Sequence, residues 1–562
     1  MKKAISIGIQ GFSALREQDC FFVDKTNFIK EWWENRDVVT LITRPRRFGK
    51  TLNMSMLECF FSNKYANRAD LFEGLSIWQE EAYRKLQGSY PVIFLSFAAV
   101  KAGNLEDAKT QIKQEIARLY RENRNLMKED IFGEDERELY YQTTVKMDDV
   151  TAQDSLRNLS EWMERYYGKK VIILLDEYDT PMQEAYVQGY WDEFTAFVRS
   201  LFNASFKTNP YLERAIMTGI TRVSKESIFS DLNNLQVITT TSDLYADCFG
   251  FTESEVFHVL DEFGMGDKKN EVKQWYDGFT FGEHKDIYNP WSITNYLDKR
   301  KTYPYWASTS SNGLVSRLIR TASADVKEKM EDLLNGREIV VSFDEQIVYN
   351  QLDHNENAIW SLLLASGYLK VKHVDYRGIT REPWYTLDIT NIETLSMFTT
   401  MFQDWFQNQD ANYGYFMKAL INGDLEAMNY YMNKVALATF SYFDVGSGNG
   451  SDPEPERFYH GFVLGLIAER AGIYEIRSNR ESGFGRYDIM MIPQEREKYP
   501  AIIIEFKVCS RMKKETLEEA VLSALDQIVD KNYDAELLSQ GIAADRIRHY
   551  GFAFEGKRVL IG

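Results

Sequence analysis

One short stretch of the chain carries residue types suited to binding phosphate. Gly49, Lys50 and Thr51 follow an apolar run at 38–42 that is typical of a buried strand, and they precede a run at 52–61 with the apolar spacing of a helix. Backbone N–H groups at such a helix start face an anion, while a lysine reaches the β- and γ-phosphates and a threonine hydroxyl holds Mg²⁺. The pattern predicts a phosphate-binding loop (P-loop) that binds ATP and magnesium.

The loop departs from the usual pattern at one position. A glycine normally stands five positions before Gly49, and this chain has Arg44 there. Because glycine turns tightly against phosphate at lower cost than other residues, we expect the residues after Arg44 to shape the loop differently, with their positive charge as partial compensation. The residues expected to contact the nucleotide are Arg46, Arg47, Phe48, Gly49, Lys50, Thr51 and Leu52. A basic turn before a surface helix is the alternative interpretation of this stretch.

A second anchor lies at Asp176 and Glu177, which follow the apolar run 171–175. Continuous apolar runs are typical of buried parallel strands, and α/β folds bind ligands at the carboxyl ends of such strands. We expect Asp176 to hold the magnesium ion through water and Glu177 to orient or deprotonate the attacking water. A solvated strand end explains the same residues taken alone, but together with the P-loop they indicate an ATPase.

A third strand is expected at 213–222. Thr218 ends its apolar part and is a candidate contact of the γ-phosphate, while Arg222, Lys225 and Arg214 are candidate phosphate contacts. These assignments are weaker, because threonine at strand ends and arginine in loops are ordinary. The alternation of strands and helices predicts a parallel sheet with helices on both faces.

A second group of chemical residues lies near the end of the chain. Glu505 and Lys507 stand two apart on the apolar run 501–508, so their side chains share one face of a strand. A charged pair is costly to bury in an apolar core, so the two residues either lie on a solvated edge or face a site. With Asp488 on a neighbouring strand, two carboxylates and a lysine can bind Mg²⁺ and activate water for attack on a phosphodiester, and Lys507 can stabilise the developing charge.

The surroundings of that group offer accessory residues. Gln527 and Tyr533 are candidates on and after a later helix, and a preceding helix offers Glu456 or His460 as an outer contact. The basic residues expected to contact backbone phosphates are Arg511, Lys513 and Lys514.

The composition sets limits on the class of protein. At 562 residues the chain is too long for one core, so several domains are expected. The net charge of −18 argues against a general nucleic-acid coat without excluding a local basic groove. Four scattered cysteines suggest neither a zinc site nor disulfides. No apolar run is long enough to span a bilayer, and the first residues lack a convincing signal cleavage site, so a cytoplasmic location and no membrane partner are expected.

The chain divides into three predicted segments, at 1–295, 296–443 and 444–562. The middle segment carries a helix that ends near Gly367 and a strand at 384–389, which fits a small helical module, one interpretation being a winged helix. Such modules bind DNA or transmit motion, and we favour the structural role because the segment lacks a basic stripe. The loop-like stretch 444–455 opens the third segment, expected to be an α/β domain.

Several strings together carry a resemblance to a known family. They are Val23-Asp-Lys-Thr26, Arg44-Pro-Arg-Arg-Phe-Gly-Lys-Thr-Leu52, Leu175-Asp-Glu-Tyr-Asp179, Ser227-Ile-Phe-Ser-Asp-Leu-Asn-Asn234, Trp275-Tyr-Asp-Gly278 and Tyr288-Asn-Pro-Trp-Ser292. Over residues 1–295 the chain resembles the AAA-ATPase-like family of prokaryotic proteins. The resemblance implies that an arginine in place of the first loop glycine is normal for such proteins.

Asp488 with Glu505-x-Lys507 resembles the PD-(D/E)xK nuclease superfamily, in the branch that often accompanies that ATPase family. The proline of the nominal signature is absent before Asp488, where Arg486 and Tyr487 stand, but a Gly-Arg-x-Asp sequence is common in that branch. The resemblance implies a restriction-endonuclease-like fold with Mg²⁺ at Asp488 and Glu505. Such a domain can keep its fold after losing catalysis.

Two hypotheses follow for the whole chain. In the first, ATP binding and hydrolysis at the P-loop change the arrangement of the domains, and the last domain cuts nucleic acid with magnesium. In the second, the protein is an ATP-dependent regulatory or signalling scaffold with a non-catalytic nuclease-like domain and a protein partner or a homo-oligomeric state. The acidic net charge favours the second, and the intact set of Asp488, Glu505 and Lys507 favours the first.

Overall fold

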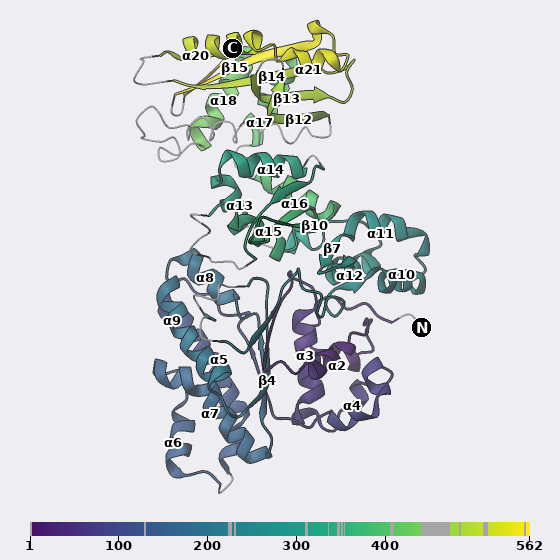
Figure 1. Ribbon diagram of the computed structural model, residues 1–562, viewed down its shortest axis with the longest axis vertical. Coiled ribbons are helices and arrows are strands. Elements are labelled where there is room, and N and C mark those ends of the chain that lie inside the picture. Colours follow the sequence, from purple (N-terminus) through teal and green to yellow (C-terminus); the bar gives the residue numbers. More distant parts are fainter. Residues whose placement is uncertain are drawn as a thin grey trace. The chain divides into compact units, whose positions relative to one another are not determined.

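The chain forms two compact units in a computed structural model (Figure 1). The N-terminal unit comprises Met1–Val315 and Val340–Thr394, and the C-terminal unit comprises Ser316–Ile339 and Leu395–Gly562. The structure describes residues 3–128, 131–222, 228–229, 232–309, 313–334, 336–345, 349, 352, 355–404, 410–439, 463, 473–482, 485–509, 515–555 and 558–562.

The N-terminal unit is built on a five-stranded parallel sheet with the order β2-β3-β4-β1-β5. Its strands are β1 (Val39–Thr43), β2 (Val92–Ser96), β3 (Val171–Asp176), β4 (Leu212–Gly219) and β5 (Leu235–Ile238). Both β1 and β3 are buried along their whole length, as expected for strands that are covered on both faces. β4 lies between them, so the P-loop and Asp176 follow strands whose carboxyl ends meet at one edge of the sheet.

Helices cover both faces of this sheet. They are α1 (Phe12–Glu17), α2 (Asn27–Asn35), α3 (Lys50–Phe61), α4 (Glu81–Leu86), α5 (Leu105–Glu122), α6 (Glu134–Gln142), α7 (Asp149–Tyr167), α8 (Thr180–Gln188) and α9 (Trp191–Phe202). Figure 1 shows α2, α3 and α4 on one side of the sheet and α5, α7 and α9 on the other. The α/β fold class predicted from the sequence is therefore confirmed, and the charged stretch at 104–168 forms α5, α6 and α7.

Two small three-stranded sheets follow along the chain, with the orders β6-β8-β7 and β10-β11-β9. Their strands and the helices beside them are β6 (Phe251–Thr252), α10 (Glu253–Glu262), α11 (Lys269–Tyr276), β7 (Phe279–Phe281), β8 (His284–Tyr288), α12 (Pro290–Lys299), β9 (Ile339–Val341), α15 (Ala358–Ala365), β10 (Leu369–Arg377) and β11 (Glu382–Ile389). α15 ends just before Gly367, whose φ of 82° is left-handed, and the β10–β11 hairpin follows. This helix and hairpin lie where the sequence suggested a winged-helix-like module, and that assignment stays a prediction.

The C-terminal unit contains a mixed sheet with the order β12-β13-β14-β15-β16, in which only β14 and β15 run parallel. Its strands and helices include α17 (Asp410–Asn422), α18 (Leu425–Thr439), β12 (Tyr474–Ser482), β13 (Gly485–Pro493), β14 (Ala501–Val508), α20 (Leu517–Asp530), α21 (Asp534–Ser539), β15 (Ile547–Glu555) and β16 (Arg558–Ile561). One core joins α17 and α18 to the sheet, and a second core joins α20 and α21 to its strands. The mixed sheet agrees with the fold expected for a nuclease-like domain.

Two asparagines of α18 cover the edge strand β16. The side-chain amide of Asn429 donates to the Ile561 carbonyl at 2.7 Å and accepts the Ile561 N–H at 2.8 Å, and Asn433 makes the same pair of bonds with Val559 at 2.6 and 3.0 Å. Each side chain thus replaces a neighbouring strand. An edge satisfied in this way does not offer its backbone to another chain.

The remaining helices are α13 (Gly313–Thr321), α14 (Ala324–Leu334) and α16 (Ile392–Asp404). Among the residues that the structure describes, no helix is both long and apolar enough to cross a membrane. The predicted linker at 444–455 lies outside the described residues, so the three-segment division of the chain stays a prediction.

A buried carboxylate at the start of α16 holds two other segments of the N-terminal unit. The Glu393 carboxylate accepts the Ser292 hydroxyl at 2.8 Å and the Trp306 backbone N–H at 2.6 Å, and its side chain is fully buried. Burial raises the pKa of Glu393 to about 7. The link between α12, residue 306 and α16 is therefore sensitive to pH.

Neutralising Glu393 is expected to remove part of the pH dependence of stability. The pKa is 4.5 for an ordinary glutamate and about 7 in the folded chain, so the folded state binds the extra proton between these values. The contribution of Glu393 to the free energy of unfolding is thus greatest below pH 4.5 and declines as pH rises toward 7. Over that range the free energy of unfolding of wild type should fall by about 2–3 kcal/mol more than that of Glu393→Gln.

Hydrogen exchange of residues 288–309 in urea, at about pH 5 and about pH 7.5, measures this difference. Glu382→Gln is the matched control, because Glu382 is exposed and bonds only the Ser342 hydroxyl among the contacts described. Identical pH slopes for wild type and Glu393→Gln would show that the buried carboxyl does not titrate as argued.

Candidate functional site

The P-loop joins β1 to α3, and its backbone turns at residues other than Arg44. Arg47 and Gly49 have left-handed φ angles of 65° and 79°, whereas the φ of Arg44 is negative. Gly49 is the N-cap of α3 and accepts the Asn53 N–H at 2.9 Å, so the amino end of α3 faces the loop. Position 44 therefore needs no glycine here, because the left-handed turns fall at Arg47 and Gly49.

Arg44 points into the core. It is 0% exposed, and its guanidinium donates to the carbonyls of Thr43 and Thr239 at 2.9 and 2.7 Å and lies 4.4 Å from the ring centre of Phe281. A longer contact reaches the Tyr245 carbonyl at 3.4 Å. Burial lowers the pKa of Arg44 to about 9. Carbonyl dipoles and a ring face replace the water that this cation loses.

The start of α12 holds the next two loop residues. The Asn289 amide donates to the Arg46 carbonyl at 3.3 Å, and its oxygen caps α12 by accepting the N–H groups of Trp291 and Ser292. The Arg47 guanidinium lies 4.3 Å from the ring centre of Trp291. These contacts explain why the string at 288–292 accompanies the P-loop, a link that the residues alone did not reveal.

Pro45 and Phe48 are fixed by close packing. The Phe48 ring lies 4.7 Å from the ring of Phe279 and 5.4 Å from that of Phe281. A Cβ on Gly367 would lie 2.8 Å from Pro45 Cγ, so the chain there must be glycine for the loop to pass. Every loop residue from 44 to 48 thus contacts a segment at least 190 residues away in sequence.

Lys50 is turned toward the loop itself. Its ammonium donates to the carbonyls of Arg44 and Pro45, each at 2.9 Å, and it is 4% exposed. Burial lowers the pKa of Lys50, and the carboxylates of Glu177 and its neighbours oppose that shift. A lysine has three N–H donors, so one is left for a phosphate oxygen. The side chain of Leu52 packs against the core of the α1–α4 face, so a contact with nucleotide is left to its backbone.

Asp176 brings two predicted site residues together. Its carboxylate accepts the Thr51 hydroxyl at 2.8 Å and the Thr218 hydroxyl at 2.5 Å, and it is 1% exposed. Burial raises the pKa of Asp176. A carboxylate beside a threonine hydroxyl offers the oxygen ligands that Mg²⁺ prefers, so these residues fit the ion. Thr218 contacts Asp176 directly, which makes it a residue that positions this carboxylate.

The two acidic residues after Asp176 have different surroundings. Glu177 has a left-handed φ of 52° and accepts the Thr180 hydroxyl at 3.0 Å. Asp179 is buried, and one of its oxygens accepts the backbone N–H groups of Ile220 and Thr221 at 2.9 and 2.8 Å. Burial raises the pKa of Asp179. Asp179 therefore fixes the loop after β4 to the loop after β3, a structural role that the sequence did not indicate.

The arginines predicted near β4 lie at different places. Arg222 lines a small cavity at the carboxyl ends of β1 and β5, together with Thr43 and Glu345. Arg214 lies in the other half of β4, donates to the Trp33 carbonyl at 2.7 Å and stacks on the Trp33 ring at 4.2 Å. Its assignment as a phosphate contact was wrong, because this end of the strand faces away from the P-loop. Lys225 lies outside the described residues.

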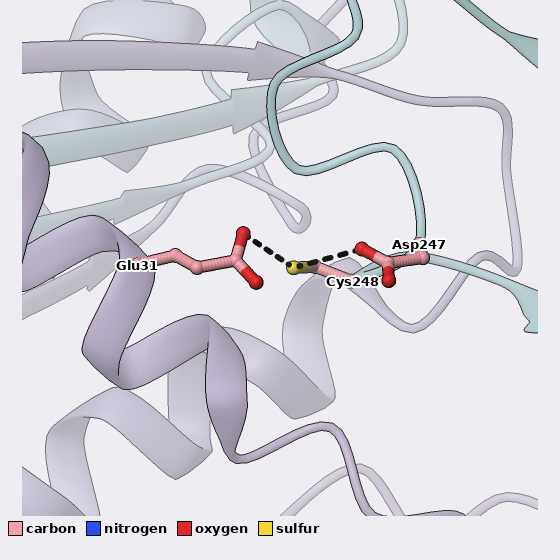
Figure 2. Close-up of side chains that lie close together, drawn as sticks. All are labelled: Glu31, Asp247 and Cys248. Carbon is pink, nitrogen blue, oxygen red and sulfur yellow. Dashed lines mark hydrogen bonds between the residues drawn. The ribbon is translucent and has the colours of Figure 1, made fainter. Parts of the chain in front are cut away.

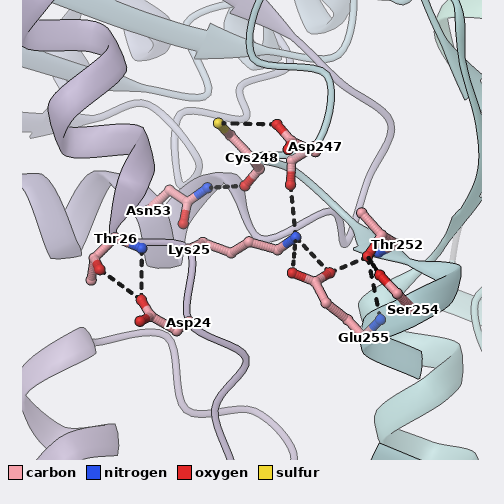
Figure 3. A network of polar contacts seen from close by, with 9 residues as sticks. All are labelled: Asp24, Lys25, Thr26, Asn53, Asp247, Cys248, Thr252, Ser254 and Glu255. Carbon is pink, nitrogen blue, oxygen red and sulfur yellow. Dashed lines mark hydrogen bonds and ion pairs between the residues drawn. The ribbon is translucent and has the colours of Figure 1, made fainter. Parts of the chain in front are cut away.

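The string at 23–26 forms a polar network behind the P-loop helix (Figure 3). The Lys25 ammonium bonds both oxygens of Glu255 at 2.7 Å and the Asp247 carbonyl at 2.7 Å. On α3, the Asn53 amide donates to the Cys248 carbonyl at 3.0 Å. The network ties α2, α3 and α10 together. The string at 23–26 therefore has a structural role, and none of the contacts described for it reaches the P-loop turn.

Figure 2 shows Glu31, Asp247 and Cys248 with their ligand atoms close together. The Cys248 thiol lies 3.5 Å from Glu31 Oε2 and 3.8 Å from Asp247 Oδ1, as a donor to both. Burial and the two carboxylates raise the pKa of the Cys248 thiol well above its usual range. The thiol and the two carboxylates thus form a hydrogen-bonded cluster. All four cysteines are free and buried.

A second site lies on the sheet of the C-terminal unit. Asp488 on β13 accepts the Phe506 N–H at 2.7 Å, next to Glu505 on β14. The Lys507 ammonium lies 3.4 Å from Glu505 Oε1 and donates to Gln527 Oε1 at 2.7 Å. The Gln527 amide in turn bonds Glu505 and donates to the Tyr533 hydroxyl at 3.0 Å. The structure thus brings all five predicted residues of this site into one connected group.

The charge of this group is unbalanced. Glu505 is 2% exposed, and its Oε2 atom is buried with no hydrogen-bond partner. Burial, followed by the charge of Asp488, raises the pKa of Glu505. This buried carboxylate oxygen accepts no hydrogen bond and lies beside a second carboxylate. Two such groups supply the oxygen ligands that a divalent cation binds. Glu505 and Asp488 therefore fit Mg²⁺.

Several accessory assignments cannot be placed. Those that lie outside the described residues are Glu456, His460, Arg511, Lys513 and Lys514.

Comparisons with known proteins match a family model to a segment near each end of the chain. Residues 6–229 match a family model described as "Predicted AAA-ATPase", and residues 454–562 match a model of the PD-(D/E)XK nuclease superfamily. The chain carries an AAA-ATPase-like domain and a PD-(D/E)XK nuclease superfamily domain. It is also similar to a protein of Azotobacter chroococcum mcd 1 described as an uncharacterized protein in the vnfD 5'region. The two are 27% identical over 398 residues, which cover 70% of this chain and 68% of the relative.

Replacing Arg44 by methionine is expected to destabilise the AAA-ATPase-like domain by about 2–4 kcal/mol, because the buried carbonyls of Thr43 and Thr239 lose their charged donor. Hydrogen exchange of residues 39–61 measures the change, and residues 501–555 of the other unit serve as an internal reference. Arg47→Met is the matched control: Arg47 is exposed and stacks only on Trp291 among the contacts described, so it should cost about 1 kcal/mol or less. If hydrogen exchange is unchanged in Arg44→Met, the prediction is wrong. The cost of burying the cation would then equal the stabilisation from its contacts.

Proposed function

We propose that this protein is a cytoplasmic ATP-hydrolysing P-loop protein whose ATPase is coupled to a Mg²⁺-dependent nuclease. The observation that supports it most directly is a pair of buried carboxylates, each beside a further oxygen ligand for a cation. One is Asp176 beside Thr51, and the other is Glu505 beside Asp488. Both family matches and the connected group around Lys507 agree with this proposal.

At the first site the chain's own residues bind and orient the nucleotide. Backbone N–H groups from Gly49 into α3 face the phosphates, and Lys50 places one free N–H toward them. Thr51 and Asp176 would hold Mg²⁺, which when bound screens the charge of the phosphates. Glu177, at the end of β3, would orient the attacking water or accept its proton.

At the second site Asp488 and Glu505 would hold Mg²⁺, which when bound supplies an activated water and shields the phosphodiester. Lys507 is held in place by Gln527, so its ammonium is positioned to stabilise negative charge on the phosphate during attack. Tyr533 in turn orients Gln527. The substrate of this site is proposed to be nucleic acid, since a phosphodiester is the bond that this set of groups attacks.

The test is Mg²⁺-dependent cleavage of DNA and RNA substrates with and without ATP, using the full chain. Glu505→Ala should lower cleavage by about 100-fold or more, because it removes a ligand and the buried charge. Lys50→Ala should abolish ATP turnover and any effect of ATP on cleavage. Glu475→Ala is the control for the first variant: Glu475 lies on β12 of the same sheet and pairs with Arg477 at 2.8 Å.

Cleavage that survives Glu505→Ala would contradict the nuclease assignment, and ATP turnover that survives Lys50→Ala would contradict the ATPase. Absence of cleavage on every substrate, with ATP turnover intact, would favour the alternative function. That alternative is an ATP-dependent regulatory scaffold whose partner is a protein or another copy of the chain, and the net charge of −18 is the observation in its favour.

A further inference from the structure

The β10–β11 hairpin ends in an exposed arm, defined here as residues 372–384. The strands pair from Leu369 with Ile389 at the base to Arg377 with Glu382 near the tip. The base is buried, whereas every residue from 375 to 382 is exposed. The exposed part of the paired ribbon runs over residues 375–377 of β10, which at about 3.3 Å per residue reach about 10 Å. The sequence favoured a purely structural role for this segment, and the structure places its cations at the end of a projecting ribbon.

The charge of the arm is opposite to that of the chain. The arm carries Lys372, Arg377 and Arg381 against Asp375 and Glu382, whereas the whole chain has 66 basic and 84 acidic residues. Its carboxylates have partners of their own: Asp375 lies 3.0 Å from the His373 ring nitrogen and 4.0 Å from the Arg377 guanidinium, and Glu382 accepts the Ser342 hydroxyl at 2.6 Å. The arm is therefore a local positive feature on an acidic protein.

Aromatic rings hold the two guanidinium groups. Arg377 lies 4.4 Å from the ring centre of Trp384, and Arg381 lies 5.4 Å from that of Tyr376. Stacking on a ring fixes the direction of a guanidinium but leaves its N–H donors free to meet an anion. Pre-ordered arginines lose less conformational entropy on binding phosphate.

The tip itself is apolar. Ile379 is 104% exposed and Tyr376 is 62% exposed, so Ile379 adds nothing to the packing of the fold. In the major groove of DNA, apolar side chains contact the methyl group of thymine. The sequence Arg377-Gly-Ile-Thr-Arg381 places such a residue between two cations.

The helix before the arm cannot serve as a recognition helix. All residues of α15 from Ala358 to Leu364 are buried. Leu362 and Leu364 line cavities beside the P-loop, with Arg46 and Thr43 respectively. Among the described residues of 340–394, the arm is thus the projecting element available to a large ligand.

We propose that the arm inserts into a groove of double-stranded DNA, with Arg377 and Arg381 contacting phosphates and Ile379 meeting the base edges. The major groove of B-form DNA is about 12 Å wide and about 8.5 Å deep, so it admits a two-stranded ribbon of this reach. An A-form RNA duplex has a deep, narrow major groove that side chains cannot read, so duplex DNA is the better fit. This proposal rests on the proposed function only in taking nucleic acid as the ligand. It does not require that the protein cleaves the nucleic acid.

The test is fluorescence anisotropy of a labelled DNA duplex of about 30 base pairs with the full chain, in EDTA so that no cleavage occurs. The Arg377→Ala/Arg381→Ala double variant should weaken binding about tenfold or more and reduce the salt-dependence slope by about 2. Ile379→Ser should weaken binding several-fold and leave the slope unchanged. Arg118→Ala/Arg157→Ala is the matched control with the same charge change, on side chains that are 51% and 39% exposed in α5 and α7.

Equal losses in the arm and control variants would overturn the proposal, because binding would then follow net charge alone. So would unchanged binding by the arm variants, no binding of duplex DNA by wild type, or tighter binding of duplex RNA or of single strands. A protein that binds DNA through the arm without cutting it would refute the nuclease and leave the arm standing. If the arm variants cleave DNA and bind it as wild type does, the nuclease stands and the arm proposal is refuted.

Discussion

The P-loop of this protein depends on a buried cation that has no carboxylate partner among the residues that the structure describes. Arg44 occupies the place of the first loop glycine, and its charge is met by the carbonyls of Thr43 and Thr239 and by the ring of Phe281. Removing a guanidinium from water costs several kcal/mol, so the loop is stable only where those carbonyls and that ring are already in place. The loop is therefore shaped from outside by the segment after β5 and by the small sheet that contains β7. In a glycine-rich loop the backbone makes the same turn by itself.

Both candidate sites use the same electrostatic arrangement. In each, one carboxylate is held by neutral donors and is buried, so its charged form is costly until a cation arrives: Asp176 is held by two hydroxyls and Glu505 by an amide. In each, a lysine lies nearby but is engaged by other groups, as Lys50 is by loop carbonyls and Lys507 by Gln527. A lysine anchored by neutral acceptors keeps its direction, and Lys507, 3.4 Å from Glu505 Oε1, offsets only part of the charge of Glu505 and Asp488.

The sequence was sufficient for what local patterns encode. Apolar runs predicted the strands that carry Asp176 and Glu505, and a spacing of two placed Glu505 and Lys507 on one face of β14. What it missed are contacts between segments far apart in the chain. Nothing near Asn289 shows that its amide reaches the Arg46 carbonyl, and nothing near Arg214 shows that it stacks on Trp33 at the far end of β4. Asp179 resembles Asp176 in sequence, yet the first binds backbone N–H groups and the second binds hydroxyls, a difference set by the path of the loop after β4.

The glycines around the P-loop show how its position is linked to the β10–β11 arm. A Cβ on Gly367, at the base of the arm, would lie 2.8 Å from Pro45, and a Cβ on Gly278 would lie 2.0 Å from the Thr390 carbonyl just after β11. Thr390 itself donates to the Gly367 carbonyl at 2.8 Å, which closes the base of the hairpin. Gly278 approaches the backbone of Thr390, where no side-chain rotation can relieve a clash, whereas Gly367 approaches the rigid ring of Pro45. The P-loop and the base of the hairpin are therefore held against each other by close packing.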